Sequence, residues 1–175
     1  MKRIYFDTEF LEDGRTIELL SIGLVDDTGA TYYAINAECD TARANDWVKA
    51  HVLPVLQTPP GPSLTRDEIR RDVLRFCGDG TAKTGGSIEF WTYNGQFDWV
   101  VLNQLFGPMG TFPAHWPSYC MDLKQWRDQL RAEGKKPKLP KQTTPAHHAL
   151  NDALWLRDAW HVFLALAAAS DHTTP

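Results

Sequence analysis

The chain has 175 residues, of which 43% are hydrophobic and 23% are charged, and its formal net charge at pH 7 is -4. This length predicts one domain with a sizeable core, and the composition is that of a soluble globular protein. The sequence contains no apolar run of about 18 residues and no secretory leader, which argues against a membrane or exported protein. A net negative charge is unlike the basic excess of most nucleic-acid-binding domains, but it is compatible with a nuclease whose acidic residues bind metal.

The local patterns predict five strands and five helices. The strands are expected at residues 3–10, 16–25, 30–38, 87–93 and 119–121. The helices are expected at 45–56, 65–78, 94–107, 122–134 and 146–169. A glycine-rich loop is expected at 78–86. The first three strands are joined by short turns and predict an antiparallel meander, whereas the fourth follows a helix and is expected to run parallel to the first. The order of elements predicts an α/β fold around a mixed sheet with the first strand at its centre.

Two carboxylates, Asp7 and Glu9, stand at the end of the first strand and are separated by one residue. Because alternate side chains of a strand share a face, the two acids project the same way, about 6–7 Å apart at Cα. Two like charges this close either raise the pKa of one of the carboxyl groups or bind a metal ion. A hard divalent cation, which prefers oxygen ligands, would neutralise them. The alternative is a strand that runs out into a solvated acidic turn.

Two further acids occupy helix positions that continue an apolar stripe. By helical spacing, Asp98 heads the stripe of its helix and Asp152 extends the stripe of the last helix. An unpaired buried carboxylate costs several kcal/mol, so these acids predict convergence on a shared cation. Four carboxylates exceed what one Mg²⁺ needs but suit two ions about 3.5–4 Å apart. For Asp98 the alternative is a carboxylate that offsets the helix dipole.

His147 and His148 precede Asp152 at the end of a polar loop. A neutral imidazole beside a metal cluster can accept a proton from water near pH 7, whereas a histidine pair at a loop-helix junction is otherwise a solvated cap. Bare helical spacing places His148 over Asp152. His147 can take that place only if it precedes the regular helix.

Three motifs carry a resemblance to a known superfamily. In order and spacing, Asp7-Thr8-Glu9, NGQFD and HHALND resemble the three motifs of the DEDDh 3′–5′ exonucleases. The stretches FDTEFLEDGRTIELLSIGLV, HVLP and LFGPM are similar to the polyadenylate-specific 3′-exoribonuclease AS group of actinobacteria. This likeness extends over most of the chain. One departure is Ser21, where the superfamily often carries an acid two residues before the glycine of the second strand.

The resemblance implies an RNase H-like fold with a mixed five-stranded sheet and helices on both faces. Residues 1–170 would form a single exonuclease domain, with 171–175 as a C-terminal tail. The implied cofactors are Mg²⁺ or Mn²⁺, two ions per site. The implied activity is release of nucleoside 5′-monophosphates from single-stranded RNA 3′ ends, with a preference for adenylate, by a homodimer that binds no membrane. Three widely spaced cysteines with neither a zinc nor a disulfide pattern favour a cytoplasmic location.

The same resemblance assigns roles to residues by motif position. It implies four acids that bind metal and act in catalysis, Asp7, Glu9, Asp98 and Asp152. His147 matches the general base, because the histidine of HxALxD lies five residues before its aspartate, and His148 remains the alternative.

Substrate contacts are expected beside these motifs, at Thr8, Phe10, Trp91, Asn94 and Phe97. Trp91 has a core position as its alternative, since most tryptophans pack in the interior. Lysines just before the last helix are expected either to contact upstream phosphates or to form a solvated loop; these are Lys135, Lys136, Lys138 and Lys141. Two rival functions stay open, a DNA-directed or short-oligonucleotide exonuclease and a catalytically silent nucleic-acid-binding domain.

Overall fold

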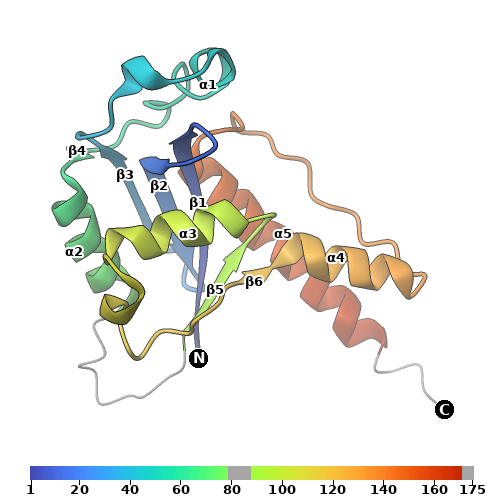
Figure 1. Cartoon of the computed structure of the whole chain (residues 1–175). Helices are drawn as coiled ribbons and strands as arrows, with labels where there is room; N and C mark the ends of the chain where they lie inside the picture. Colours follow the sequence, from blue (N-terminus) through green and yellow to red (C-terminus); the bar gives the residue numbers. More distant parts are fainter. Residues whose placement is uncertain (79–87, 171–175) are drawn as a thin grey trace.

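A computed structural model describes residues 1–78 and 88–170 of the chain (Figure 1). Its centre is a six-stranded sheet in the order β4-β3-β2-β1-β5-β6. The strands are β1 (Lys2–Glu12), β2 (Ile17–Asp26), β3 (Thr31–Asn36), β4 (Ser63–Leu64), β5 (Ile88–Thr92) and β6 (Met121–Asp122). The α-helices are α1 (Asp46–His51), α2 (Arg66–Cys77), α3 (Gln96–Leu105), α4 (Leu123–Ala132) and α5 (Ala149–Ser170). Two 3₁₀ helices, η1 (Thr41–Arg43) and η2 (Met109–Thr111), lie in the connections.

Strand β1 lies inside the sheet and organises it. It pairs antiparallel with β2 and parallel with β5, which confirms the predicted central strand and the predicted parallel fourth strand. The sheet has six strands where the sequence predicts five. The additional strand is β4, which pairs with the edge of β3. Its two residues are too few to show the alternation by which a strand is predicted from sequence.

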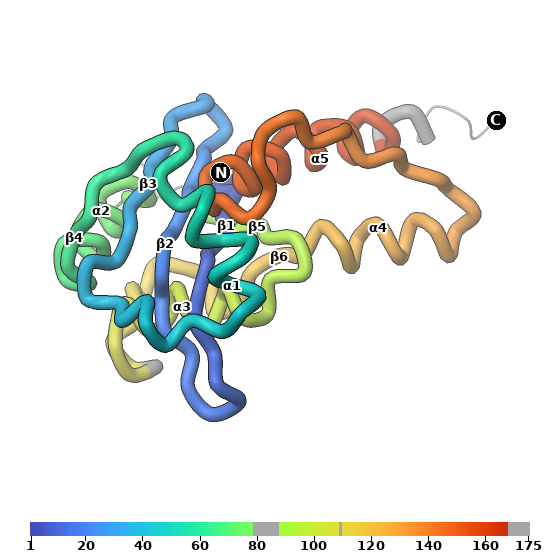
Figure 2. The backbone as a smooth tube through the Cα atoms, turned by 90° about the horizontal axis from the view of Figure 1, so that it is seen from above, coloured from blue at the N-terminus to red at the C-terminus, as the bar shows by residue number. Residues whose placement is uncertain are grey.

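Helices cover both faces of the sheet, as predicted (Figure 1). Ile4 and Phe6 of β1 pack beneath α2 and α3 in one hydrophobic cluster. Tyr5 faces the other side and packs in a second cluster with Leu156 and Phe163 of α5. This alternation is the period of two expected of a strand buried on both faces. Helices α4 and α5 extend beyond the sheet on one side, and the connection between them returns from the far end of α4 to the start of α5 beside the sheet (Figure 2).

The start of α5 is set by its contact with β2. A Cβ on Gly23 would lie 2.3 Å from the backbone nitrogen of Leu150, so only glycine allows the helix to approach the strand this closely. The helix begins at Ala149, three residues after the predicted start. His147 has a φ of 64°, outside helical geometry, which explains the later start.

Side chains cap two of the helices. Thr65 and Glu68 form a capping box at the start of α2, and the side chain of Asp122 caps α4. The expected glycine-rich loop lies outside the described residues apart from Gly78, and so does the expected tail at 171–175. Among the described helices, none is both long and apolar enough to cross a bilayer.

Candidate active site

A cavity of about 240 Å³ lies where β1, the turn after β5 and the start of α5 meet. Its polar lining combines residues from both ends of the chain. The lining residues are Asp7, Tyr93, Gln142, Ala146, His147, Asp152, Trp155 and Leu156. Two of the predicted acids and the predicted base therefore face one cavity, although 140 and more residues separate Asp7 from His147 in the sequence.

The four predicted acids are electrostatic neighbours. Burial, together with the charges of Asp98, Glu9 and Asp152, raises the pKa of Asp7 well above its usual value. Burial and the charges of Asp152 and Asp98 raise the pKa of Glu9 to about 8. Such mutual repulsion arises only when carboxylates from separate elements share a small space. The convergence predicted from the sequence is therefore present, while the role of these acids as metal ligands stays a prediction.

Asp98 is held in place by the residue between the two strand acids. The backbone N–H of Thr8 donates to Asp98 Oδ1 at 2.8 Å, and the Thr8 hydroxyl donates to the same oxygen at 2.7 Å. Burial raises the pKa of Asp98, and these two hydrogen bonds oppose that rise. Thr8 is itself 4% exposed. Thr8 thus holds the Asp98 carboxylate in position, and its contact with substrate stays a prediction.

The turn before α3 positions Asp98 next to β1. Asp122 accepts hydrogen bonds from the backbone N–H groups of Asn94, at 3.0 Å, and Gly95, at 3.2 Å. A Cβ on Gly95 would lie 2.2 Å from Cβ of Thr92, so the turn requires glycine at this position. The sequence identifies Asp122 only as a helix cap. Its bond to a turn 27 residues earlier has no local signal.

The two adjacent histidines have different environments. His147 lines the cavity, and its backbone N–H donates to Asp152 Oδ2 at 2.9 Å. His148 is fully buried, lies 3.0 Å through Nε2 from the carbonyl oxygen of Pro59, and packs against the Tyr33 ring with centroids 4.3 Å apart. Because His147 precedes α5, the helical period does not apply to it. Of the two alternatives, only His147 faces the acids.

Glu9, His147 and Asp152 form the tightest group. One potential ligand atom from each lies within 4.8 Å of the other two. Gln142 donates through Nε2 to Asp152 Oδ1, which helps to fix the carboxylate that the backbone of His147 also contacts. Sequence analysis missed Gln142, because it stands in a polar loop without a recognisable motif.

Two aromatic residues of α1 lie beside His147. The rings of Trp47 and His147 meet edge to face with centroids 4.9 Å apart, and Trp47 stacks on His51 at 5.0 Å. Trp47 is 50% exposed. His51 opens the HVLP stretch of the family resemblance, but no sequence signal assigns either α1 residue to the site, since they lie about a hundred positions from His147 and only tertiary structure brings them together.

The remaining predicted substrate contacts fall into two groups. Phe97 is 57% exposed, and its ring lies 5.7 Å from that of Phe10, which is half-buried against the hydrophobic core. Asn94 is exposed on the turn described above. Trp91 is 6% exposed and packs against the rings of Trp126 and Trp160, as its core alternative predicts. Its contact with substrate stays a prediction.

The donor set fits hard divalent cations. All four acids offer carboxylate oxygens, which Mg²⁺ and Mn²⁺ prefer over nitrogen or sulfur. The raised pKa values of Asp7 and Glu9 describe a repulsion that a cation would relieve.

Comparison with solved structures defines the fold class. The nuclease domain of 3′hExo, a DEDDh family member bound to rAMP, matches with a TM-score of 0.55 at 12% identity, covering 95% of this chain and 92% of that chain. A full-length 3′-exonuclease matches with a TM-score of 0.59 at 13% identity, covering 95% and 82%. The fold is therefore the RNase H-like fold of the DEDDh exonucleases, as predicted.

Sequence comparison then identifies the family. Residues 2–164 match the 3′–5′ exoribonuclease Rv2179c-like domain. The chain is 42% identical over 173 residues to the 3′–5′ exoribonuclease Rv2179c of Mycobacterium tuberculosis strain H37Rv, covering 97% of this chain and 95% of that protein. The same figures hold for the 3′–5′ exoribonuclease MT2234.1 of strain CDC 1551. The chain belongs to the Rv2179c-like 3′–5′ exoribonuclease family, which confirms the predicted enzyme class.

Proposed function

We propose that this exoribonuclease removes nucleoside 5′-monophosphates from the 3′ end of single-stranded RNA, prefers adenylate, and uses two divalent ions held within one domain spanning residues 1–170. The observation that carries the proposal is the meeting of four carboxylates and one histidine, of which Asp7, Asp152 and His147 line one cavity. Isolated acids are common on protein surfaces. Four carboxylates whose charges raise the pKa values of Asp7 and Glu9, beside an imidazole, are the arrangement that metal-assisted phosphodiester hydrolysis requires.

Asp7, Glu9, Asp98 and Asp152 would hold the Mg²⁺ or Mn²⁺ ions. Bound there, divalent ions would lower the pKa of water and offset the negative charge that builds up on the phosphate during the reaction. Thr8 would keep Asp98 aimed at the site through its two hydrogen bonds, and Gln142 would do the same for Asp152. Removing a residue that holds a metal ligand in this way typically lowers metal affinity or activity by about 10–100-fold.

His147 would accept the proton of the attacking water. A histidine side chain is suited to this step because its ordinary pKa lies near neutrality. The Asp152 carboxylate next to it would stabilise the imidazolium that forms, and proximity to His147 correspondingly lowers the pKa of Asp152 against the rise caused by burial. Trp47 would limit the rotation of the imidazole through its edge-to-face contact.

The terminal base would stack on Phe97, which is exposed and contacts the half-buried ring of Phe10. Base-aromatic stacking contributes about 1–3 kcal/mol per base and tolerates any sequence, so an adenylate preference would need further contacts. The structurally similar nuclease domain of 3′hExo is bound to rAMP, which supports an adenylate nucleotide as the first ligand to test. Selection of RNA over DNA would require a contact to the terminal 2′-hydroxyl, from Glu9 or nearby backbone.

The test is nucleotide release from matched 5′-labelled homopolymers of A, U and C, in RNA and DNA form, with Mg²⁺ or Mn²⁺ and with chelator. We expect RNA to shorten one nucleotide at a time, oligoadenylate fastest, and no shortening in chelator. Equal rates on DNA would favour the DNA-directed alternative. Intact substrates under all metal conditions would favour the silent binding domain and overturn the proposal. Calorimetric titration with Mn²⁺ would report the number of ions bound.

The assembly and location belong to the same proposal. We propose a cytoplasmic homodimer, and the three free cysteines among the described residues are compatible with a reducing compartment. Light scattering coupled to size exclusion would give the mass in solution. A monomer of 19.8 kDa at all concentrations would contradict the dimer.

A further inference from the structure

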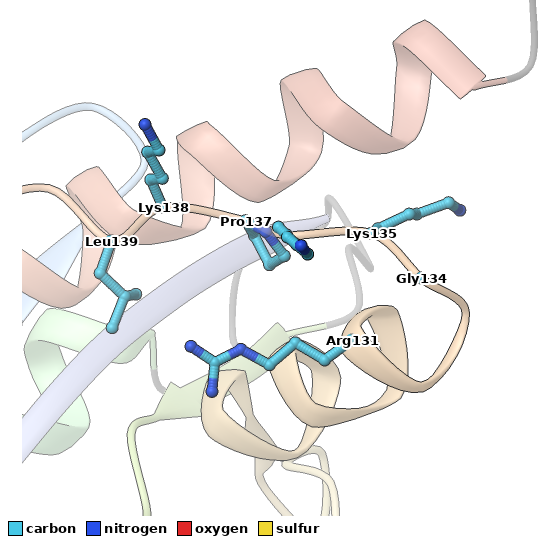
Figure 3. A pocket seen from close by; sticks show the side chains of 7 residues that line it. Arg131, Gly134, Lys135, Pro137, Lys138 and Leu139 are labelled. Carbon is cyan, nitrogen blue, oxygen red and sulfur yellow. The ribbon is translucent and has the colours of Figure 1, made fainter.

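An open cavity of about 690 Å³ lies between the end of α4 and the loop that follows it. Four of its seven lining residues are cations and none is an acid. The lining residues are Arg131, Gly134, Lys135, Lys136, Pro137, Lys138 and Leu139. In Figure 3 Arg131 extends from α4 beneath the loop, whereas Lys135 and Lys138 extend away from the loop in other directions. The positive charges therefore line an extended surface, here called the basic loop surface.

Much of this charge is not neutralised by the protein. Among the described residues, Lys136 and Lys138 have no acidic group within 4.0 Å and both are exposed. The Lys135 Nζ atom lies 3.0 Å from Glu133 Oε2, and Arg131 Nη1 lies 4.0 Å from Asp128 Oδ1. Both acids are themselves solvent-facing. The whole chain carries 22 acidic and 18 basic residues, so this local excess of positive charge runs against the overall balance. A surface of this kind attracts a polyanion.

The loop that carries these lysines is anchored at several points. Its start is held by the Lys135 N–H, which donates to the carbonyl oxygen of Leu130 at 2.9 Å. Leu139 packs in the hydrophobic cluster beneath α5, and Trp155 Nε1 donates to the carbonyl oxygen of Pro140 at 2.8 Å. The lysines are thus presented by a backbone that is fastened along α5.

The same loop leads directly to the catalytic acids. Four residues after Lys138, Gln142 donates to the carboxylate of Asp152. Four residues of extended chain span at most about 14 Å. Stacked nucleotides of one strand rise by about 3.4 Å each along the axis of the strand, so this reach corresponds to about four nucleotides.

We propose that the basic loop surface binds the phosphates of the RNA strand upstream of the scissile bond, beginning about four nucleotides from the 3′ end. The inference rests on the proposed function, because it takes the cavity at Asp7 and His147 as the point where the 3′ end is cleaved. Phosphate contacts from flexible lysines position a strand and carry no base specificity. The surface would strengthen binding of long RNA of any sequence, and a dinucleotide would not reach it.

The test compares two variants with the same change in charge. K135Q/K136Q/K138Q removes the loop cations, and R70Q/R71Q/R75Q removes three exposed cations of α2, which packs on the opposite face of the sheet. Each would be assayed on an oligoadenylate dinucleotide and on a strand of about 20 nucleotides, over a range of salt concentrations. The unfolding midpoint of each variant would show that the fold is retained.

For the loop variant we expect unchanged turnover of the dinucleotide and a kcat/KM on the long strand lowered by about tenfold or more at low salt. The slope of log kcat/KM against log salt should become less negative by about 2, because each single-strand phosphate contact contributes about 0.7. The α2 variant should match the original protein in both respects. An equal salt slope for the two variants, or an equal loss on both substrates, would overturn the inference. Failure of the proposed function would look different, since no length of RNA would then be shortened by any variant.

Discussion

The two charged regions of this protein are built in opposite ways. The four carboxylates that meet beside β1 are buried or half-buried and close together, and Thr8 and Gln142 hold Asp98 and Asp152 in position. The lysines of the basic loop surface are spread along a loop, and Lys136 and Lys138 are exposed without an acidic partner within 4.0 Å among the described residues. Burial is the physical difference between them. It makes the like charges of the acids strong enough to shift pKa values, while water screens the charges of the lysines.

This contrast fits the two tasks of an exonuclease. Chemistry at one phosphorus atom needs ligands held within a fraction of an ångström, and hydrogen-bonded side chains provide this. Holding a polymer that moves forward after every cleavage needs weak contacts that can be exchanged, and flexible lysines provide those. Substitutions in the acid cluster should therefore lower turnover by the same factor on substrates of every length. The loop variant should instead lower it only on long strands.

The largest effect is expected for Asp7→Asn. Asp7 feels the charges of the three other acids, so its neutralisation should remove metal binding and lower turnover by more than the 10²–10⁴-fold typical of a lost general base, taken as an order of magnitude. The loss should be the same for a dinucleotide and a long strand. Because repulsion falls, the unfolding midpoint in chelator should stay equal or rise. Residual activity that depends on substrate length would contradict the separation of the two regions.

The next largest effects are expected for alanine substitutions at the two adjacent histidines. His147→Ala should lower kcat by about 10²–10⁴-fold with little change in stability. His148→Ala should retain kcat per folded molecule but destabilise the protein by about 1–3 kcal/mol, because it removes a buried ring and its hydrogen bond to Pro59. Single-turnover rates and urea unfolding measure the two effects. The assignment of His147 fails if the two variants exchange these phenotypes.

The buried acids should also make the metal-free protein sensitive to pH. The folded state raises the pKa of Glu9 from 4.5 to about 8, so it holds the proton more tightly than the unfolded chain does. The resulting stability is fully present below about pH 4.5 and should decline as the pH rises towards 8, by up to several kcal/mol. Urea unfolding in chelator at about pH 5 and pH 8 measures this decline. Glu9→Gln should reduce it, whereas the loop variant should leave it unchanged.

The smallest effect is expected for Trp47→Ala. The edge-to-face contact with His147 is of a type that contributes about 0.5–1.5 kcal/mol, which corresponds to a loss of about 2-fold to 10-fold in kcat. KM should change little on short and long strands. Trp47→Phe keeps an aromatic ring and should recover most of the rate. A large rise in KM instead would mean that Trp47 contacts the RNA itself.

Some site residues could not be assigned before the tertiary structure was known. Trp91 was expected at the substrate because it stands in a strand next to a catalytic motif, but a strand has two faces and its alternation does not say which one is covered by a helix. In the fold, that face lies under Trp126 and Trp160. Trp47 and Gln142 reach the site through long-range packing, which leaves no periodic trace in the sequence.

The sequence by itself determined the positions of the four acids on their elements, because the periods of strands and helices are local properties that neighbouring residues reveal. It also determined the family, through motifs preserved in order and spacing. Only the tertiary structure decided which of two adjacent histidines faces the acids, since the close approach of α5 to Gly23 and the left-handed backbone at His147 together set that orientation. It likewise decided that a lysine-rich loop runs along α5 towards Asp152, because that course depends on contacts between residues distant in the chain.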